Sequence, residues 1–184
     1  MTRRNTREII LKAAKEAFSK KGYDAVSIDE IAQIAGVRKS LIYYYFPSKE
    51  ALFEEVWINS IEELENELFN SEKDEPTYIT KIKSFLRKYI DFLTSKKEIA
   101  DLLRKEKAKV LDKKDWENAK SKYENFLQRV EELIIEGKNK KVIKEEVDPK
   151  AVTEMIASVD SVPRKTLLKS VEEMLIKILL KDNT

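Results

Sequence analysis

Residues 26–52 read VSIDEIAQIAGVRKSLIYYYFPSKEAL and contain the signals of two short helices joined by a tight turn. Ser27 followed by Glu30 three residues later is a capping box, which favours the start of a helix. Gly36 suits the left-handed backbone that ends this helix. A second short helix follows at about residues 38–45. Two short helices on either side of a glycine turn predict a helix-turn-helix.

The apolar residues of this stretch fit the packing that a helix-turn-helix requires. Its helices cross steeply, so the residue at the crossing must be small and the residues beneath it must be apolar. Ala32 supplies the small contact. The inward positions are filled by Ile31, Ala35, Val37 and Ile42. The second helix begins with polar residues, and this end of the second helix enters the major groove in such motifs.

Outside this stretch the sequence also predicts helices. Only three glycines and four prolines interrupt 184 residues, and no segment alternates for long with a two-residue period. Apolar residues instead recur at helical spacing, which predicts an all-α protein of about nine helices. The other predicted helices cover residues 6–21, 49–69, 77–94, 99–110, 116–136, 149–161 and 163–181.

Several of these helices have local signals at their ends. Gly22 and Gly137 follow helices at the position where glycine commonly ends them. Ser48 is an expected N-cap. Asp148 followed by Pro149 combines an N-cap with proline at the first helical position, which marks a sharp helix start.

The residue types that are missing exclude much of enzyme chemistry. The chain contains no cysteine and no histidine. Disulfides, thiolate catalysis and zinc sites with the usual ligands are therefore excluded. Ser-His-Asp and Cys-His arrangements are excluded for the same reason. We expect no metal and no cofactor, and an enzyme is disfavoured.

Charge is nearly balanced overall but unevenly distributed. The chain has 36 basic and 34 acidic residues, and residues 1–50 hold 10 basic and 6 acidic ones. A basic N-terminal part is typical of a protein that contacts a polyanion at one end. On charge alone, an ordinary solvated helix face remains the alternative.

The sequence predicts two domains. Residues 1–48 are expected to form the helix-turn-helix DNA-binding domain, and residues 49–184 a helical ligand-sensing and dimerisation domain. The N-terminus has no apolar stretch resembling a signal peptide, and the apolar runs are far shorter than the roughly 20 residues of a membrane span. We therefore expect a cytoplasmic protein without a membrane partner.

Residues 22–56, which read GYDAVSIDEIAQIAGVRKSLIYYYFPSKEALFEEV, resemble the DNA-binding signature of the TetR/AcrR repressors nearly position by position. The preceding REIILKAAKEAFSKKGY resembles the first helix of that family. The tyrosines followed by Phe46, Ser48, Lys49 and Glu50 are more specific than a generic helix-turn-helix. The C-terminal two-thirds resemble the family only in helix count, helix lengths and the segment from Gly137 to Pro149.

The resemblance implies a recognition helix in the major groove with phosphate contacts beside it. Lys39 would donate to guanine, and Tyr43 or Tyr44 would offer a hydroxyl to phosphate and a ring to a thymine methyl. Ser27 and Lys49, each at a helix start, would bind phosphate. The implied DNA-contacting residues are Ser27, Arg38, Lys39, Ser40, Tyr43, Tyr44 and Lys49.

Four further residues have two interpretations each. Tyr45 stands where many members of the family carry histidine, and it would either reach a phosphate or pack on Phe46. Arg3, Arg4 and Arg7 would either contact phosphate or the minor groove, or be left without a fixed position at the chain end.

The resemblance also implies a homodimer that reads a palindromic operator in double-stranded DNA. The last two helices of each subunit would form a four-helix bundle, although their apolar stripes also suit the subunit's own core. The implied interface residues are Met155, Ile156, Val159, Leu167, Leu168, Val171, Leu175 and Ile178.

A small-molecule effector is the third implied partner. In this family the central helices enclose a ligand pocket, and occupancy rotates the DNA-binding heads apart. The scarcity of neutral polar residues in these helices favours a hydrophobic or amphipathic effector. The candidate lining residues are Trp57, Phe85, Tyr89, Phe92, Trp116, Tyr123 and Phe126.

Two other roles remain beside the repressor. Because the sign of regulation depends on where the operator lies, an activator or another DNA-binding factor with the same head is also compatible with the sequence. A helical interaction protein without a DNA role is disfavoured by the recognition-helix signature.

Overall fold

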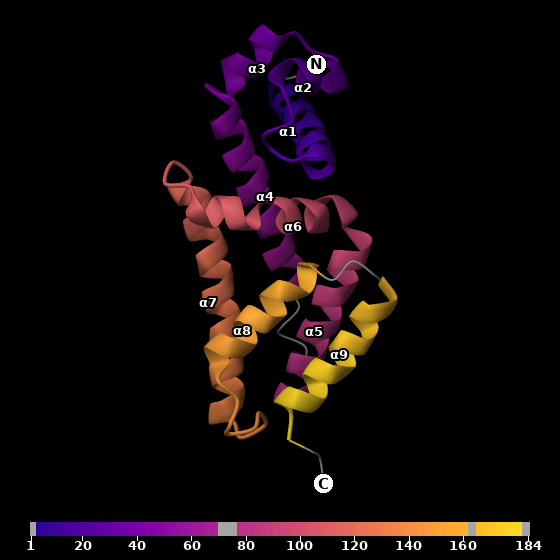
Figure 1. The fold of residues 1–184 in the computed structure, drawn as a ribbon, viewed down its shortest axis with the longest axis vertical. Coiled ribbons are helices and arrows are strands. Elements are labelled where there is room, and N and C mark those ends of the chain that lie inside the picture. The colour runs from indigo at the N-terminus through magenta and orange to yellow at the C-terminus, as the bar shows by residue number, and fades with distance from the viewer. Residues whose placement is uncertain (1–2, 70–76, 162–164, 182–184) are drawn as a thin grey trace. The chain divides into compact units, whose positions relative to one another are not determined.

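The computed structural model describes residues 3–69, 77–161 and 165–181, with all side chains in these ranges except those of residues 3, 4, 161 and 165–168. The described residues confirm the predicted all-α fold (Figure 1). Their only β-type pairing is one isolated bridge between Ile143 and Leu180. The helices are α1 (Arg3–Lys21), α2 (Ile28–Ala35), α3 (Lys39–Tyr45), α4 (Lys49–Phe69), α5 (Tyr78–Ser95), α6 (Lys97–Asp112), α7 (Glu117–Asn139), α8 (Pro149–Ala157), the 3-10 helix η2 (Ser158–Ser161) and α9 (Lys165–Leu179).

Backbone packing divides the chain into two compact units. Unit 1 comprises residues 1–61 and 97–122, and unit 2 comprises residues 62–96 and 123–184. Helix α6 therefore belongs to the same unit as the helix-turn-helix, although the sequence analysis assigned it to the C-terminal domain. Within unit 1, α6 packs against α1.

An aromatic cluster forms the core of unit 1. The Phe53 ring stacks on Trp116 with 4.6 Å between ring centroids, and it meets Tyr23 edge-on at 5.0 Å. Trp57 is fully buried, and its indole nitrogen donates a hydrogen bond to the carbonyl of Ala119 at 3.2 Å. Aromatic side chains bury more area than other residues, so this cluster holds α4, the end of α1 and the start of α7 together.

The local signals at three helix ends are confirmed. The side-chain oxygens of Ser48 and Asp148 each accept a hydrogen bond from the backbone N–H three residues later, at 3.1 and 2.7 Å. Pro149 is the first residue of α8. Gly22 follows α1 with φ +82°, a conformation that costs glycine little.

The prediction that Gly137 ends its helix is wrong. Helix α7 continues to Asn139, and Lys141 takes the left-handed conformation with φ +60°. A Cβ atom on Gly137 would lie 2.7 Å from Cδ1 of Ile143 and 3.0 Å from Cδ1 of Ile82. The glycine is therefore needed for close packing and not for a turn.

Gly137→Ala tests this interpretation by the sign of its effect. Helix propensity alone would make alanine about 1 kcal/mol more stable than glycine. Overpacking against Ile143 is expected instead to lower the free energy of unfolding by about 1–3 kcal/mol. Urea unfolding of the variant, beside Asn139→Ala in the same helical turn as a control, measures the difference. A stabilised Gly137→Ala would contradict the close-packing explanation.

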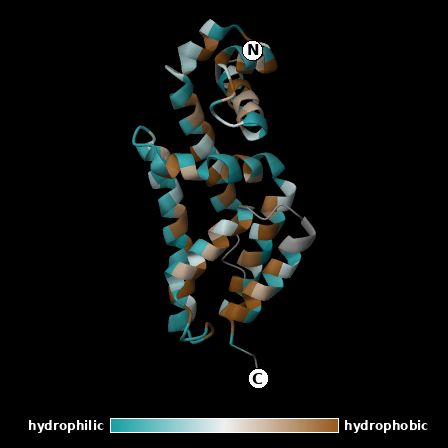
Figure 2. Cartoon of the chain, in the orientation of Figure 1, coloured by the Kyte–Doolittle hydropathy of each residue, from teal (hydrophilic) through white to brown (hydrophobic). Residues whose placement is uncertain are grey.

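Hydrophilic and hydrophobic positions alternate along the helices (Figure 2). In the part of the chain that the structure describes, no helix is both long enough and apolar enough to cross a membrane.

Candidate nucleic-acid interface

The helix-turn-helix of unit 1 is assembled around Gly36. Ser27 Oγ accepts a hydrogen bond from the backbone N–H of Glu30 at 3.1 Å, which starts α2. Gly36 ends α2 with φ +66°, and the next residue, Val37, donates its N–H to the carbonyl of Ala32 at 3.0 Å. The turn is thus closed by backbone hydrogen bonds, which sets the direction in which α3 leaves it.

The inner face of the motif follows the predicted pattern. Ile31 and Ile42 are fully buried beneath the crossing of α2 and α3. Ala35 and Val37, also predicted to point inward, are half-buried, as is Tyr45 at the end of α3. Because Ile42 anchors one side of α3 in the core, the residues on the opposite side of this helix face away from it.

The outer face of α3 exposes every predicted recognition residue. Arg38, Lys39 and Ser40 are exposed at the start of the helix. Tyr43 is 46% exposed and Tyr44 is 64% exposed. Two adjacent exposed tyrosines are unusual, since an aromatic ring gains more from burial than from contact with water. Cations, hydroxyls and rings therefore stand together on one accessible helix face.

Lys39 already has an ionic partner on this face. Its amine lies 2.7 Å from a carboxylate oxygen of Asp29 in α2. This hydrogen bond raises the pKa of Lys39, so the amine carries its positive charge. Both side chains are well exposed, and an exposed pair of this kind contributes little stability. The pair can therefore open at small cost when another hydrogen-bond acceptor approaches Lys39.

The start of α4 places a second cation near the motif. The Lys49 amine lies 4.3 Å from the centre of the Tyr23 ring, and partial burial lowers its pKa. The Tyr23 hydroxyl donates to Glu50 at 2.6 Å, a hydrogen bond that lowers the pKa of this carboxyl. Lys49 is thus held in contact with an aromatic ring by a side chain that still reaches solvent.

Three residues of α6 grip the end of α1, and we call them the α6 clasp: Lys105, Glu106 and Lys109. The Lys105 amine donates to the last two carbonyls of α1, at 2.5 and 2.6 Å. Glu106 is buried and accepts a hydrogen bond from the backbone N–H of Tyr23 at 2.9 Å. Lys109 forms an ion pair with Asp24.

Sequence reasoning missed the α6 clasp because its partners lie 83 to 86 residues apart in the chain. Gly22 carries the one local trace of it. A Cβ atom at Gly22 would lie 2.7 Å from the Glu106 carboxylate, so the glycine also makes room for this side chain.

The N-terminal arginines divide into one described and two undescribed side chains. Arg7 pairs with Glu55 at 2.5 Å, and its guanidinium lies 5.1 Å from the centre of the Phe46 ring. Arg7 therefore ties α1 to α4 and to the end of the motif. The side chains of Arg3 and Arg4 lie outside the described residues.

All the predicted pocket aromatics are buried, but they fall into both units. Trp57 and Trp116 belong to the core of unit 1. The others lie in unit 2, on α5 (Phe85, Tyr89, Phe92) and α7 (Tyr123, Phe126).

The predicted interface residues also divide by exposure. Ile156, Val159 and Leu175 are buried inside their own unit, whereas Met155 and Ile178 are exposed and Val171 is half-buried. The side chains of Leu167 and Leu168 lie outside the described residues. A hollow of about 420 Å³ opens between α8 and α9; it is lined by Ala151, Glu154, Met155, Ser158, Val159, Val171, Met174 and Leu175.

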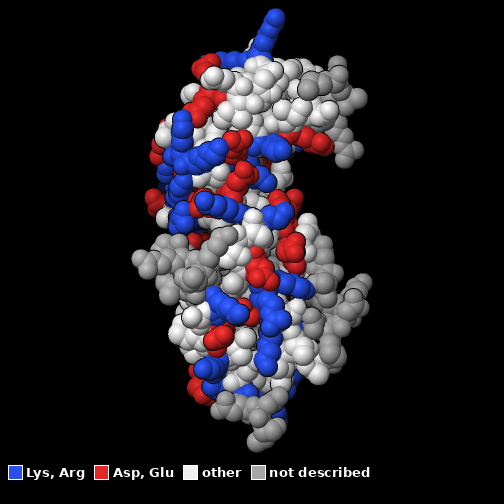
Figure 3. All heavy atoms as spheres, turned by 90° about the vertical axis from the view of Figure 1, so that its right-hand side faces the viewer, with Lys and Arg blue, Asp and Glu red and all other residues white. Residues whose placement is uncertain are grey.

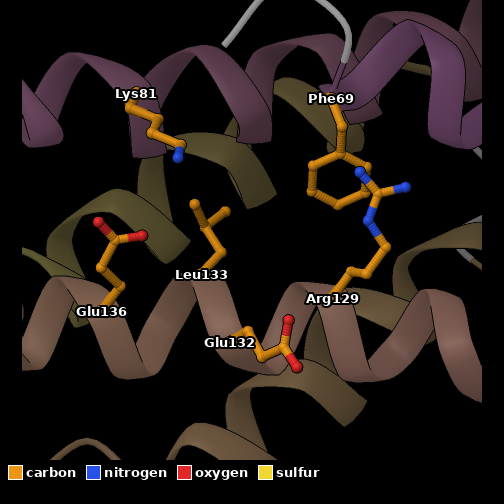
Figure 4. Close-up of a pocket in the computed structure, with 6 residues that line it drawn as sticks. All are labelled: Phe69, Lys81, Arg129, Glu132, Leu133 and Glu136. Atoms are coloured by element: carbon orange, nitrogen blue, oxygen red, sulfur yellow. The ribbon is translucent and has the colours of Figure 1, made fainter. Parts of the chain in front are cut away.

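A smaller cavity of about 150 Å³ lies in unit 2 between α7 and the helices opposite it (Figure 4). Arg129 lies 4.0 Å from the centre of the Phe69 ring, and Lys81 faces Leu133 across the space. Glu132 and Glu136 complete the lining. Opposite charges thus neutralise one another around this cavity.

Basic and acidic side chains are intermixed on the face drawn in Figure 3. This face therefore presents no broad field of one sign, in keeping with the nearly equal numbers of basic and acidic residues.

Known proteins match both the motif and the fold. The model of the family "Bacterial regulatory proteins, tetR family" matches residues 10–56. The transcriptional regulator RutR of Escherichia coli (strain K12) is 47% identical over 47 residues, covering 26% of this chain and 22% of RutR. The uncharacterised regulator YhgD of Bacillus subtilis (strain 168) is 38% identical over 58 residues, covering 32% of this chain and 30% of YhgD. These matches span less than a third of either relative.

The whole chain matches a solved structure. HlyIIR, a hemolysin II transcriptional regulator, superposes with a TM-score of 0.77 at 26% sequence identity. The match covers 98% of this chain and 100% of HlyIIR. The likeness in fold therefore extends well beyond the segment that the family model covers.

Proposed function

Since this chain is a TetR-family transcriptional regulator, we propose that it binds a palindromic operator as a homodimer, represses transcription there, and is released by a small hydrophobic or amphipathic effector. Residues 1–48 would bind DNA in the cytoplasm, and residues 49–184 would sense the effector and dimerise. No catalytic role or cofactor is part of this proposal. The observation that carries it is the outer face of α3, where cations and tyrosines are exposed while Ile42 anchors the helix in the core.

On DNA, the roles follow from where each side chain stands. Lys39 exchanges Asp29 for guanine O6 and N7, and Arg38 and Ser40 approach the adjacent bases or phosphates. Tyr43 and Tyr44 contact phosphate through the hydroxyl or a thymine methyl through the ring. Ser27, at the start of α2, and Lys49, at the start of α4, hold the flanking phosphates.

Truncation of the recognition residues tests the DNA-binding proposal. Tyr43→Ala and Lys39→Ala are each expected to weaken binding to the selected operator by about 1–3 kcal/mol if they read a base. Fluorescence anisotropy with the operator and with random duplex measures the difference, and Gln33→Ala on exposed α2 serves as control. If both truncations bind the operator like the parent chain, α3 is not the reading helix. A reporter gene behind the operator distinguishes repression from activation.

Lys49→Ala addresses the phosphate contact separately. Because a phosphate contact carries no sequence information, the loss is expected to be the same for operator and random duplex. The slope of log affinity against log salt should become shallower by about one unit. Lys20→Ala, which removes an exposed lysine paired with Glu16, is the matched control. Unchanged binding of Lys49→Ala at several salt concentrations would refute the clamp.

A second copy of the chain is the proposed occupant of the α8–α9 hollow. Met155, Met174 and Ile178 leave large apolar surfaces exposed on these two helices. A twofold axis through this surface would cover the same residues on both subunits, as a closed symmetric dimer requires. Two recognition helices roughly 34–36 Å apart then read the two halves of a palindrome.

The α6 clasp supplies a route for the effector's signal. Helix α6 is held to the end of α1 by Lys105 and Glu106, while the chain continues from α6 in both directions into unit 2. An effector that favours one arrangement of unit 2 can therefore pull on the DNA-binding head through α6. Release requires that the effector bind the two arrangements with different affinity.

A further inference from the structure

Four polar side chains are enclosed among the aromatic residues of unit 2, and we call them the interior polar cluster: Tyr89, Tyr123, Thr153 and Asp160. They come from α5, α7, α8 and η2, and none is more than 5% exposed. Thr153 and Asp160 are seven residues apart, two helical turns, which places them on one face of the continuous α8–η2 segment.

Polar groups in such a position need a reason. A buried hydroxyl or carboxylate costs free energy unless its hydrogen bonds or its charge are matched. Thr153 Oγ1 has no hydrogen-bond partner among the described residues. Burial, and then the negative charge of Asp160, raises the pKa of both Tyr89 and Tyr123. The carboxylate charge therefore acts on both phenols from close by.

Aromatic rings surround this carboxylate. The Phe85 ring is parallel to that of Tyr89 with 6.5 Å between centroids, and the Phe126 ring lies 6.1 Å from that of Tyr123. Ring faces attract cations, most strongly where water is excluded, and a carboxylate adds a full negative charge to that attraction. A neutral or anionic ligand group would gain neither.

We propose that the effector is an amphipathic organic cation whose charged nitrogen binds at the interior polar cluster, beside Asp160 and the rings of Tyr89 and Tyr123. Its apolar body lies along Phe85 and Phe126. This deepens the proposed function and rests on it, since it names the effector class of that regulator. Thr153 Oγ1 is then the hydrogen-bond partner of a ligand group.

Calorimetric titration of the full chain without DNA tests the class of ligand. The probes are octyltrimethylammonium, octanol and octanoate, each below its micellar concentration, so that only the head group differs. The cation is expected to bind about tenfold more tightly than the other two, or better. Equal binding of octanol or octanoate, or no binding of the cation, would overturn the inference. Duplex binding by the same preparation judges the proposed function independently.

Variants test the position of the site. Asp160→Asn is expected to abolish the preference for the cation, while Asp91→Asn, the same change at an exposed position on α5, keeps it. Thr153→Val is the second variant. It should fold like the parent, because the hydroxyl has no intramolecular partner, and lower cation affinity about fivefold. Parental cation affinity in a folded Thr153→Val or Asp160→Asn would place the site elsewhere.

Discussion

Met174→Glu is expected to yield a monomer whose affinity for a palindromic duplex is lower by about 10²–10⁴-fold. Met174 lies on α9, is 49% exposed, and lines the hollow between α8 and α9. In a symmetric dimer the substitution places two carboxylates in one apolar interface, where neither has a counter-charge. The large effect on DNA follows because two linked heads bind with an effective concentration that separate heads lack.

Sedimentation at micromolar concentration and anisotropy with a palindromic duplex measure the two consequences. Met174→Leu keeps an apolar side chain of similar volume and is expected to behave like the parent chain. If Met174→Glu remains dimeric with unchanged operator affinity, the subunits meet through another surface. If it becomes monomeric but binds as before, the operator is read by a single head.

Trp116→Ala is expected to lower the free energy of unfolding by about 3–5 kcal/mol. Trp116 is fully buried, stacks on Phe53 and meets the Tyr23 ring edge-on at 4.8 Å. The Lys113 amine lies 4.2 Å from its ring centre. Removing the indole leaves a cavity where α1, α4 and the α6–α7 connection meet.

Urea unfolding checks this, and Trp116→Phe is the control. The indole nitrogen of Trp116 has no hydrogen-bond partner among the described residues, so phenylalanine loses no hydrogen bond and keeps most of the packing. The smaller loss expected for Trp116→Phe separates packing from polar effects. A Trp116→Ala variant as stable as the parent would contradict a structural role in unit 1 and favour a place in the effector pocket.

The local part of the fold was predictable because its causes are local. Ser27, Gly36 and Ser48 act within three or four residues of themselves, through backbone hydrogen bonds and a left-handed φ. The exposure of Tyr43 and Tyr44 followed from the same reasoning, since α3 is one short helix with Ile42 on its buried side. These features can be derived from spacing and residue type alone.

The failures concern residues whose partners lie far away in the chain. Gly137 carried the local mark of a helix end, but the close approach of Ile143 and Ile82 explains it. The α6 clasp left no pattern, because a lysine and a glutamate on a helix usually face solvent. The apolar stripes of α8 and α9 likewise did not reveal that Ile156 is buried while Met155 is exposed.

From the amino-acid order alone came the positions of the helices, the helix-turn-helix, the absence of thiol and imidazole chemistry, and the residues that face outward on α3. Tertiary structure decided that α6 joins the head through Lys105 and Glu106, and that Tyr89, Tyr123, Thr153 and Asp160 share one interior. The physical reason is range. Capping, helical periodicity and backbone preference act over a few residues, whereas burial and charge pairing depend on which distant segments pack together.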